Sequence, residues 1–153
     1  MIKMKNCGDF VAELTVSGAQ TTTAGAPTTQ TSCIVPFNGR LSAIFARLKV
    51  AGTTGNQNVD LFQNGTSLTG GSGLFSFPTT VGGNAAPTYS TGNLTSNPVL
   101  VSKGDVLSCV NLSVHSGTAA NDLSVYVTIE RQRTGTFDEA MQTDTVGADS
   151  DII

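Results

Sequence analysis

The sequence is poor in the residues from which catalytic sites and helices are built. Its 153 residues include one histidine, no tryptophan, three glutamates and four lysines, and only 12% of them are charged. Most active sites need a cluster of titratable side chains, so we expect neither an enzyme nor a bound cofactor. Glutamate and lysine are also strong helix formers on protein surfaces, and their scarcity disfavours long helices.

Signals for nucleic acids and membranes are also missing. The formal net charge is −3, whereas a nucleic-acid-binding protein usually carries a basic patch and has a high pI. No segment approaches the roughly 18 consecutive apolar residues of a membrane span. The opening segment MIKMKNCGDF lacks the apolar core of a signal peptide. We therefore expect no nucleic acid and no membrane among the partners, and no secretion.

The three cysteines form no recognisable motif. Cys7, Cys33 and Cys109 contain no CxxC spacing and leave one cysteine over in any disulfide scheme. This usage suits a reducing compartment. We expect no metal site.

The abundant residues favour strands and turns. Thr (22), Gly (17), Ser (14) and Asn (10) make up 63 of the 153 residues, and there are 14 Val. Thr and Val favour pleated sheets, whereas Gly, Asn and Ser favour turns. Because a chain of about 150 residues is usually one domain, the composition predicts a single all-β domain.

Apolar and polar residues alternate with a period of two in several segments, which is typical of strands with one buried face. Leu41–Val50 also satisfies helical spacing, but the Asn-Gly and Ala-Gly-Thr-Thr-Gly turns that flank it favour a strand. The other predicted strands are Phe10–Val16, Val59–Gln63, Leu74–Phe77, Val99–Val101, Val106–Val114 and Leu123–Glu130.

The same alternation predicts which side chains share one face of a strand. Each set is expected to turn toward the core. The three clearest sets are Ile44, Ala46, Leu48 and Val50; Val106, Ser108, Val110, Leu112 and Val114; and Leu123, Val125, Val127 and Ile129.

Two long connections interrupt the strands. Ser17–Ser32 has no large apolar residue, which predicts a loop or an arm. Gly70–Pro98 is rich in glycine and proline, and because long connections in compact domains are usually functional, we expect a contact surface there. The Asn-Gly pairs that begin at Asn38 and Asn64 predict tight turns.

Seven or eight strands joined by turns and loops predict an antiparallel β-sandwich. A parallel sheet would need crossover helices, and the pattern contains no alternation of strands with helices. The expected organisation is an N-terminal arm at residues 1–9, a sandwich domain at residues 10–136 and an acidic tail at residues 137–153.

Charge is unevenly distributed along the chain. From Phe137 onward there are five acidic residues and no basic one, while the preceding residues contain eight basic and six acidic groups. An acidic tail of this kind is commonly a solvated segment. The alternative is an arm that becomes ordered on a partner, and the apolar end formed by Ile152 and Ile153 favours docking.

Two groupings of polar residues could carry chemistry, and both have simpler interpretations. His115, Ser116 and Asp122 could form a catalytic triad, but no nucleophile motif surrounds them, so His115 is interpreted as a loop histidine. Asp60, Asp105 and Asp122 could gather around a metal ion. However, each lies beside a turn, where aspartate commonly bonds to nearby backbone.

The basic residues allow two interpretations. Arg47 and Lys49 share a strand face, with Arg40 just before it. These charges can simply keep an outer face soluble, or they can orient an acidic protein partner. By the same alternation, Arg131 and Arg133 fall on the inward face of the last strand, together with Ile129. The strand must therefore leave the core there or meet a partner.

Four motifs together resemble the small jelly-roll modules of tailed-bacteriophage virion proteins. The resemblance covers about residues 33–131 and rests on structural motifs. They are Pro36-Phe-Asn-Gly39 with Leu41–Leu48, Val59-Asp-Leu-Phe-Gln-Asn-Gly-Thr-Ser-Leu68, Val101-Ser-Lys-Gly-Asp-Val-Leu107, and Asp122-Leu-Ser-Val-Tyr-Val-Thr-Ile-Glu130.

The resemblance implies a jelly-roll sandwich of about eight strands and a structural role in the virion. We favour a capsid decoration (cement) protein that is made in the host cytoplasm, binds the major capsid protein on the outside of the head, and forms a homotrimer. The alternative is a receptor- or glycan-binding module of a tail or head fibre. The expected contact residues are Lys3, Lys5, Arg40, Arg47, Lys49, Arg131, Arg133, Asp138, Glu139, Ile152 and Ile153.

Overall fold

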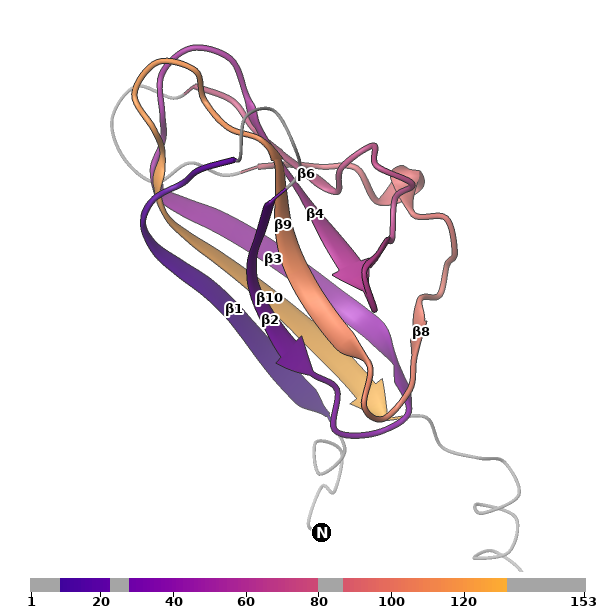
Figure 1. Cartoon of the computed structure of the whole chain (residues 1–153). Coiled ribbons are helices and arrows are strands. Elements are labelled where there is room, and N and C mark those ends of the chain that lie inside the picture. Colours follow the sequence, from indigo (N-terminus) through magenta and orange to yellow (C-terminus); the bar gives the residue numbers. More distant parts are fainter. Residues whose placement is uncertain (1–8, 23–27, 80–86, 132–153) are drawn as a thin grey trace, which may run out of the picture.

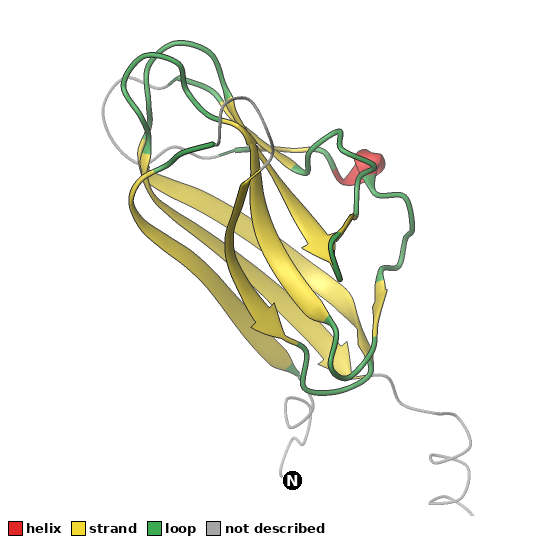
Figure 2. Ribbon diagram, in the orientation of Figure 1, coloured by secondary structure: helices red, strands yellow, loops and turns green. Residues whose placement is uncertain are grey.

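The computed structural model describes residues 9–22, 28–79 and 87–131, and these form two antiparallel β-sheets packed face to face (Figures 1 and 2). One short 3-10 helix, Thr91–Asn93, is the only helical element within these ranges. The described part of the chain therefore confirms the predicted antiparallel β-sandwich.

Ten strands are assigned within the described ranges, two more than the largest number predicted. Three of them have no counterpart among the predicted segments: the seven-residue strand Thr28–Ile34 and the two-residue strands Thr66–Ser67 and Thr88–Tyr89. The strands are β1 Phe10–Ala19, β2 Thr28–Ile34, β3 Gly39–Val50, β4 Gln57–Gln63, β5 Thr66–Ser67, β6 Phe75–Phe77, β7 Thr88–Tyr89, β8 Leu100–Val101, β9 Val106–Ser113 and β10 Asn121–Arg131.

The strand order is that of a jelly roll. One sheet has the order β1-β10-β3-β8, and the other has the order β2-β9-β4-β6-β7, with β5 paired to β4. Early strands therefore pair with late ones in reverse sequence: β1 with β10, β2 with β9, β3 with β8, and β4 with β6. This nested pairing characterises the two Greek keys of a jelly roll.

The strand β10 forms the centre of the four-stranded sheet and supplies much of the core. Leu123, Val125, Val127 and Ile129 are all buried, as their alternation predicted. They lie between inward-facing residues of β1 and β3, such as Leu14 and Leu48. Because both neighbours of β10 are paired along most of its length, this strand is locked in a single register.

The predicted strands β1 and β3 are confirmed and are slightly longer than expected. In β3, Ala46 and Leu48 are buried, whereas Val50 at the strand end is 48% exposed. The pairing of β3 with β10 shifts between Thr128 and Ile129, which lets Leu41 also turn toward the core. A β-bulge of this kind changes the face on which later residues lie.

The prediction for residues 17–32 was wrong at both ends. Ser17–Ala19 continues β1, and Thr28–Ser32 begins β2, so the loop is shorter than expected. The physical reason is that an edge strand with one exposed face does not need large apolar residues. The β-branched threonines suit this position, and the ladder to β9 supplies backbone hydrogen bonds.

The predicted face of β9 was also wrong. The residues that reach the core cluster are Leu107 and Cys109, with Asn111 buried in the same alternation. Val106 instead is 36% exposed, and Val110 is buried outside the core cluster. Both faces of this strand carry apolar residues, so alternation alone could not choose between them.

The Asn64-Gly65 turn joins β4 and β5 as a two-residue hairpin. Asn64 has φ 51° and Gly65 has φ 81°, which are the positive values that a type I′ turn requires. This turn confirms the prediction from the Asn-Gly pair. At Asn38-Gly39, in contrast, Gly39 begins β3 instead of closing a hairpin.

The connection after β5 is organised by Asp60, which is fully buried on the side of β4 opposite to the core residues Val59 and Leu61. Its carboxylate accepts hydrogen bonds from the hydroxyl groups of Ser67 and Thr69 and from the Leu61 backbone. Those hydroxyl oxygens in turn accept bonds from backbone N–H groups of residues 69, 71 and 73. One carboxylate thus holds a whole turn against the sheet.

Buried polar residues occupy the end of the sandwich that carries the loops 51–56 and 114–120. The side chain of Asn111 donates to Gln20 at 3.4 Å and accepts from Gln57 at 3.0 Å. His115 is also buried there, with 3% of its surface exposed. The amide side chains of Gln20, Gln57 and Asn111 close this end of the core with hydrogen bonds to one another.

Candidate functional site

The described chain begins and ends at the opposite end of the sandwich. Phe10 pairs with Ile129 across β1 and β10, so Asp9 and Arg131 are both at this end (Figure 1). The start of β3 joins them, because Gly39 pairs with Arg131. Segments distant in the sequence therefore meet at one place.

Gly39 permits the close approach of β3 to β10 at this end. A Cβ atom at this position would lie 2.3 Å from the backbone oxygen of Glu130 and 3.1 Å from the Ile129 side chain. No larger residue fits without moving one of the two strands. The glycine therefore fixes the position of the preceding residues, Phe37 and Asn38, relative to Arg131.

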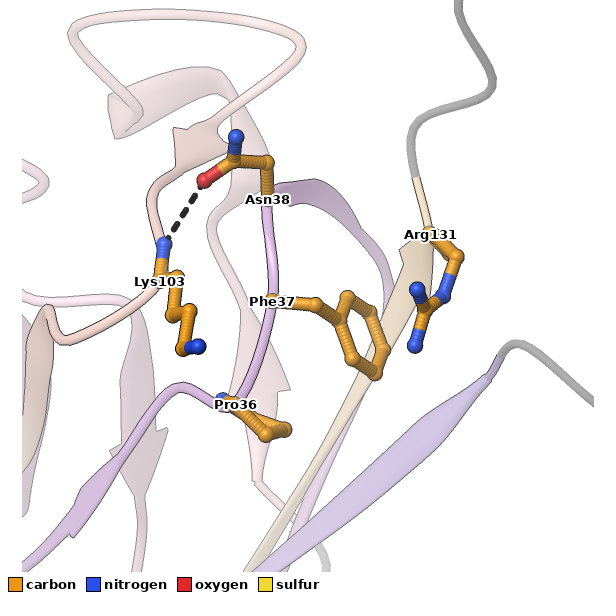
Figure 3. A pocket seen from close by; sticks show the side chains of 5 residues that line it. All are labelled: Pro36, Phe37, Asn38, Lys103 and Arg131. Atoms are coloured by element: carbon orange, nitrogen blue, oxygen red, sulfur yellow. Dashed lines mark hydrogen bonds between the residues drawn. The ribbon is translucent and has the colours of Figure 1, made fainter. Parts of the chain in front are cut away.

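A shallow pocket of about 460 Å³ opens beside this contact. Its lining comes from the segment before β3, the β8–β9 turn and the end of β10 (Figure 3). The lining residues are Pro36, Phe37, Asn38, Lys103 and Arg131.

The position of Lys103 is fixed by the backbone of its turn. The Lys103 N–H donates to the side-chain oxygen of Asn38 at 2.8 Å (Figure 3). The next residue, Gly104, has φ 92° and donates its N–H to the oxygen of buried Val35 at 2.8 Å. The turn and the segment before β3 therefore form one unit.

Asp105 ties this unit to the hairpin at Asn64. Its carboxylate accepts bonds from the Ser102 N–H at 2.8 Å, the Asn64 side chain at 2.8 Å and the Gln63 side chain at 2.6 Å. These bonds, chiefly that from Ser102, lower the pKa of Asp105 from its ordinary value of 3.8. Two motifs that are 41 residues apart are thereby joined.

The pocket combines apolar surface with positive charge. The guanidinium carbon of Arg131 lies 4.4 Å from the centroid of the Phe37 ring, a cation–π contact. Lys103 adds a second cation, and none of the described residues that line the pocket is acidic. Pro36 and Phe37 offer apolar contact. This arrangement suits a carboxylate-bearing side chain flanked by an apolar one.

The predicted basic contact residues are divided between two places. Arg131 lines the pocket, and nearby Arg40 forms a 3.0 Å ion pair with Glu130. Arg47 and Lys49 instead lie farther along β3, where Lys49 is 3.7 Å from Asp122. The other predicted contacts lie outside the described residues; they are Lys3, Lys5, Arg133, Asp138, Glu139, Ile152 and Ile153.

The sequence-based prediction missed four of the five pocket residues. Pro36, Phe37, Asn38 and Lys103 all fall within motifs that were interpreted as structural. The sequence did contain one signal for these residues: the Pro-Phe-Asn-Gly and Ser-Lys-Gly-Asp motifs both lie next to the ends of predicted strands. Their proximity depends on the pairing of β3 with β8, which local patterns do not reveal.

The residues of the hypothetical triad make separate contacts. Asp122 accepts from the Gly18 N–H at 2.7 Å, and Ser116 donates its hydroxyl to the Thr54 oxygen at 3.4 Å. Neither ring nitrogen of His115 has a hydrogen-bond partner among the described residues. Gly52 packs against the ring, where an added Cβ would lie 2.5 Å away. His115 is thus a buried loop residue.

Within the described ranges, no group of three or more His, Cys, Asp or Glu side chains could hold a metal ion. Asp60, Asp105 and Asp122 each bond to different partners. Asp105 and Asp60 both accept from nearby backbone N–H groups, as expected for aspartates beside turns.

Two cysteines are described, and both are free thiols. Burial raises the pKa of Cys33. Burial, together with the charge of Asp60, raises the pKa of Cys109 from 9.0 to about 12. These thiols are therefore protonated at neutral pH and poor nucleophiles. Cys7 lies outside the described residues.

Comparison with protein-family models, curated proteins and solved structures finds no match to this chain. In the described part of the chain, no helix has the length and apolar character to cross a bilayer.

Proposed function

We propose that this protein is a capsid decoration protein of a tailed bacteriophage, which binds the outside of the head and stabilises it by bridging major capsid subunits. The observation that carries the proposal is the meeting of both described chain ends with the Phe37–Arg131 pocket at one end of the sandwich. We assign this end as the attachment side, because Asp9 and Arg131, the first and last residues of the described chain, both lie there.

The chemistry of the pocket fits an acidic, partly apolar protein surface. Arg131 and Lys103 provide charge attraction and orientation, while Pro36 and Phe37 provide apolar contact. Arg40 is less suited to this role because Glu130 already pairs with it. We therefore assign the main contact to Arg131 and Lys103, with the arm 1–9 and the tail 137–153 as additional contacts.

The mechanism is mechanical. A protein that contacts several capsid subunits requires several contacts to open together before the shell comes apart. Multivalent attachment can raise avidity by roughly 10²–10⁴ without a new type of contact. A jelly roll with nested strand pairing is a suitable bridge, because its strands are hydrogen-bonded into two packed sheets.

The experiment is titration of the purified protein onto undecorated capsids of the phage that encodes it. We expect saturation at a fixed number of copies per capsid, with binding weakened by salt because cations contribute. Arg131→Glu with Lys103→Glu should abolish binding. Absence of saturable binding overturns the proposal, and binding to host cells or glycans instead would favour the fibre module.

A further inference from the structure

The pocket beside Phe37 carries two cations without a carboxylate partner among the described residues. Lys103 is exposed, and within the described ranges its side chain has no hydrogen bond or ion pair, since the bond to Asn38 comes from its backbone N–H. The guanidinium of Arg131 lies over the Phe37 ring, which holds its position without neutralising its charge. The pocket thus presents unpaired positive charge beside an aromatic ring.

Three described carboxylates lie at this end of the sandwich, and none of them forms an ion pair with a pocket cation. Asp105 follows Lys103 closely but accepts its hydrogen bonds from its own turn and from the β4–β5 hairpin. Glu130 forms its ion pair with Arg40. Asp9, at the start of the described chain, forms no ion pair with a described residue. The pocket therefore lacks the anion that its charge would attract.

The sequence that follows β10 contains a segment of matching chemistry. Phe137, Asp138 and Glu139 place two carboxylates directly after an aromatic ring. Residues 137–153 contain five acidic residues and no basic one. These residues lie outside the described ranges, and the argument from them is one of sequence.

We propose that the segment Phe137–Glu139 occupies the pocket of its own chain while the protein is free. Its aromatic ring packs against Pro36 and Phe37, and its two carboxylates pair with Lys103 and Arg131. The pocket volume of about 460 Å³ is within the range of sites that hold small ligands. Each part of the site thereby gains a partner that suits it.

The short connection favours docking within one chain. Phe137 follows Arg131 by six residues, which span at most about 20 Å, and the intervening Gly135 suits a turn back toward the pocket. A short linker gives an effective concentration of about 1 mM, so a contact with a Kd of about 1 mM is already about half occupied. A second copy of the chain would have to be present at a comparable concentration to compete.

Another acidic and apolar stretch, Asp151-Ile152-Ile153, is less favourably placed. It begins 20 residues after Arg131. Effective concentration falls roughly as the −3/2 power of linker length, so it is about sixfold lower for this stretch than for Phe137–Glu139. The nearer segment is therefore the occupant.

Docking has a consequence for attachment, and this consequence rests on the proposed function. A capsid that binds at the pocket must first displace Phe137–Glu139, while the rest of the tail stays available for further contacts. Asp138→Asn with Glu139→Gln should then strengthen binding to undecorated capsids at least twofold if half of the free protein is docked. Unchanged or weaker binding would overturn the competition. Wild-type protein that ignores capsids would overturn the decoration role alone, because docking is tested on free protein.

The first test uses fluorescence. The chain contains no tryptophan, so Phe137→Trp introduces a single fluorophore at the proposed contact. We expect emission at shorter wavelength than from a peptide of residues 132–142 with the same tryptophan, and no change over an approximately hundredfold range of protein concentration. Emission equal to that of the peptide, or a shift that grows with protein concentration, would overturn docking within the chain.

Charge reversal locates the contact. Added to Phe137→Trp, Lys103→Glu should move the emission to the value of the peptide, and it leaves the backbone bond to Asn38 in place. Lys49→Glu is the matched control, because it makes the same charge change near the other end of β3 and breaks only an exposed ion pair. Equal effects of the two reversals would overturn the assignment to this pocket.

The second test keeps the native aromatic residue. The amide NMR signal of Lys103 should shift when Asp138→Asn and Glu139→Gln are made together. Asp144→Asn with Asp149→Asn removes the same number of charges from the tail and should leave that signal in place. Equal shifts from the two double variants, or no shift from either, would overturn the proposal.

Discussion

The guanidinium of Arg131 lies 4.4 Å from the centre of the Phe37 ring and thereby joins the last residue of β10 to the segment before β3. The two residues are almost a hundred positions apart in the chain. Their contact lies on an exposed side of the sandwich, beside Lys103. An arginine held in this way keeps its charge available to a partner while its position is fixed.

The contact should matter more for binding than for folding. Phe37→Leu removes the aromatic face, and an exposed cation–π contact contributes about 0.5–1 kcal/mol. We expect a small loss in the free energy of unfolding by urea, together with a clear loss of capsid binding. Arg131→Lys keeps the charge and serves as the comparison; if it binds as poorly as Arg131→Glu, charge is not the basis of the interaction.

Gly39→Ala should be among the most destabilising single substitutions. Its Cβ would lie 2.3 Å from a backbone oxygen of β10, so a strand must shift. We expect a loss of about 3 kcal/mol in urea unfolding. Gly92→Ala is the control, because no atom lies within 4 Å of its added Cβ, and a similar loss there would contradict this explanation.

Asp60→Ala should loosen the turn after β5. The substitution leaves the hydroxyls of Ser67 and Thr69 without their carboxylate acceptor, and hydrogen bonds to charged groups contribute about 1.5–3 kcal/mol each. We expect a loss of at least about 2 kcal/mol and faster amide exchange at residues 69, 71 and 73. Unchanged exchange there would show that the carboxylate does not organise the turn.

Cys109 should resist alkylation in the folded protein. Its pKa is raised to about 12, so hardly any thiolate is present at pH 8. Iodoacetamide followed by mass spectrometry should label Cys109 only after denaturant is added. The raised pKa in the folded state also predicts stability that is complete below pH 9 and falls as the pH rises toward 12. Cys109→Ala should reduce this alkaline loss.

Asp105 should make the stability of the folded protein depend on pH in the acidic range. Its pKa is lower in the folded state than the ordinary 3.8, so its contribution is present above that pH and is lost as the pH falls through the folded value. The effect should be small because the carboxylate is only partly buried. The unfolding temperature of Asp105→Asn should fall less at low pH than that of the wild type. An identical dependence of the unfolding temperature on pH would contradict the assignment.

Local patterns were sufficient for the sandwich because its central strand β10 alternates strictly. Leu123 through Ile129 place every second residue in the core, and no other assignment buries them. The pattern failed at β9, where Leu107 and Val106 are both apolar, and at β2, where the threonines carry no burial signal. In both places the neighbouring strand decides the structure.

The candidate site was less accessible to prediction than the fold. Arg131 was identified because alternation places this charged residue on the same strand face as Ile129, which is expected to face the core. Phe37 and Lys103 were not, since their proximity requires β3, β8 and β10 to be assembled first. A site formed by three chain segments at a strand end has no local signature.

The most direct test of the decoration role is the temperature at which capsids come apart. Undecorated capsids should be disrupted at a higher temperature after the protein is added at saturation. The variant with Arg131→Glu and Lys103→Glu should give no increase, although its own unfolding temperature should fall only slightly with the loss of the Phe37–Arg131 contact. An unchanged disruption temperature with the wild-type protein bound at saturation would contradict the proposed stabilising role.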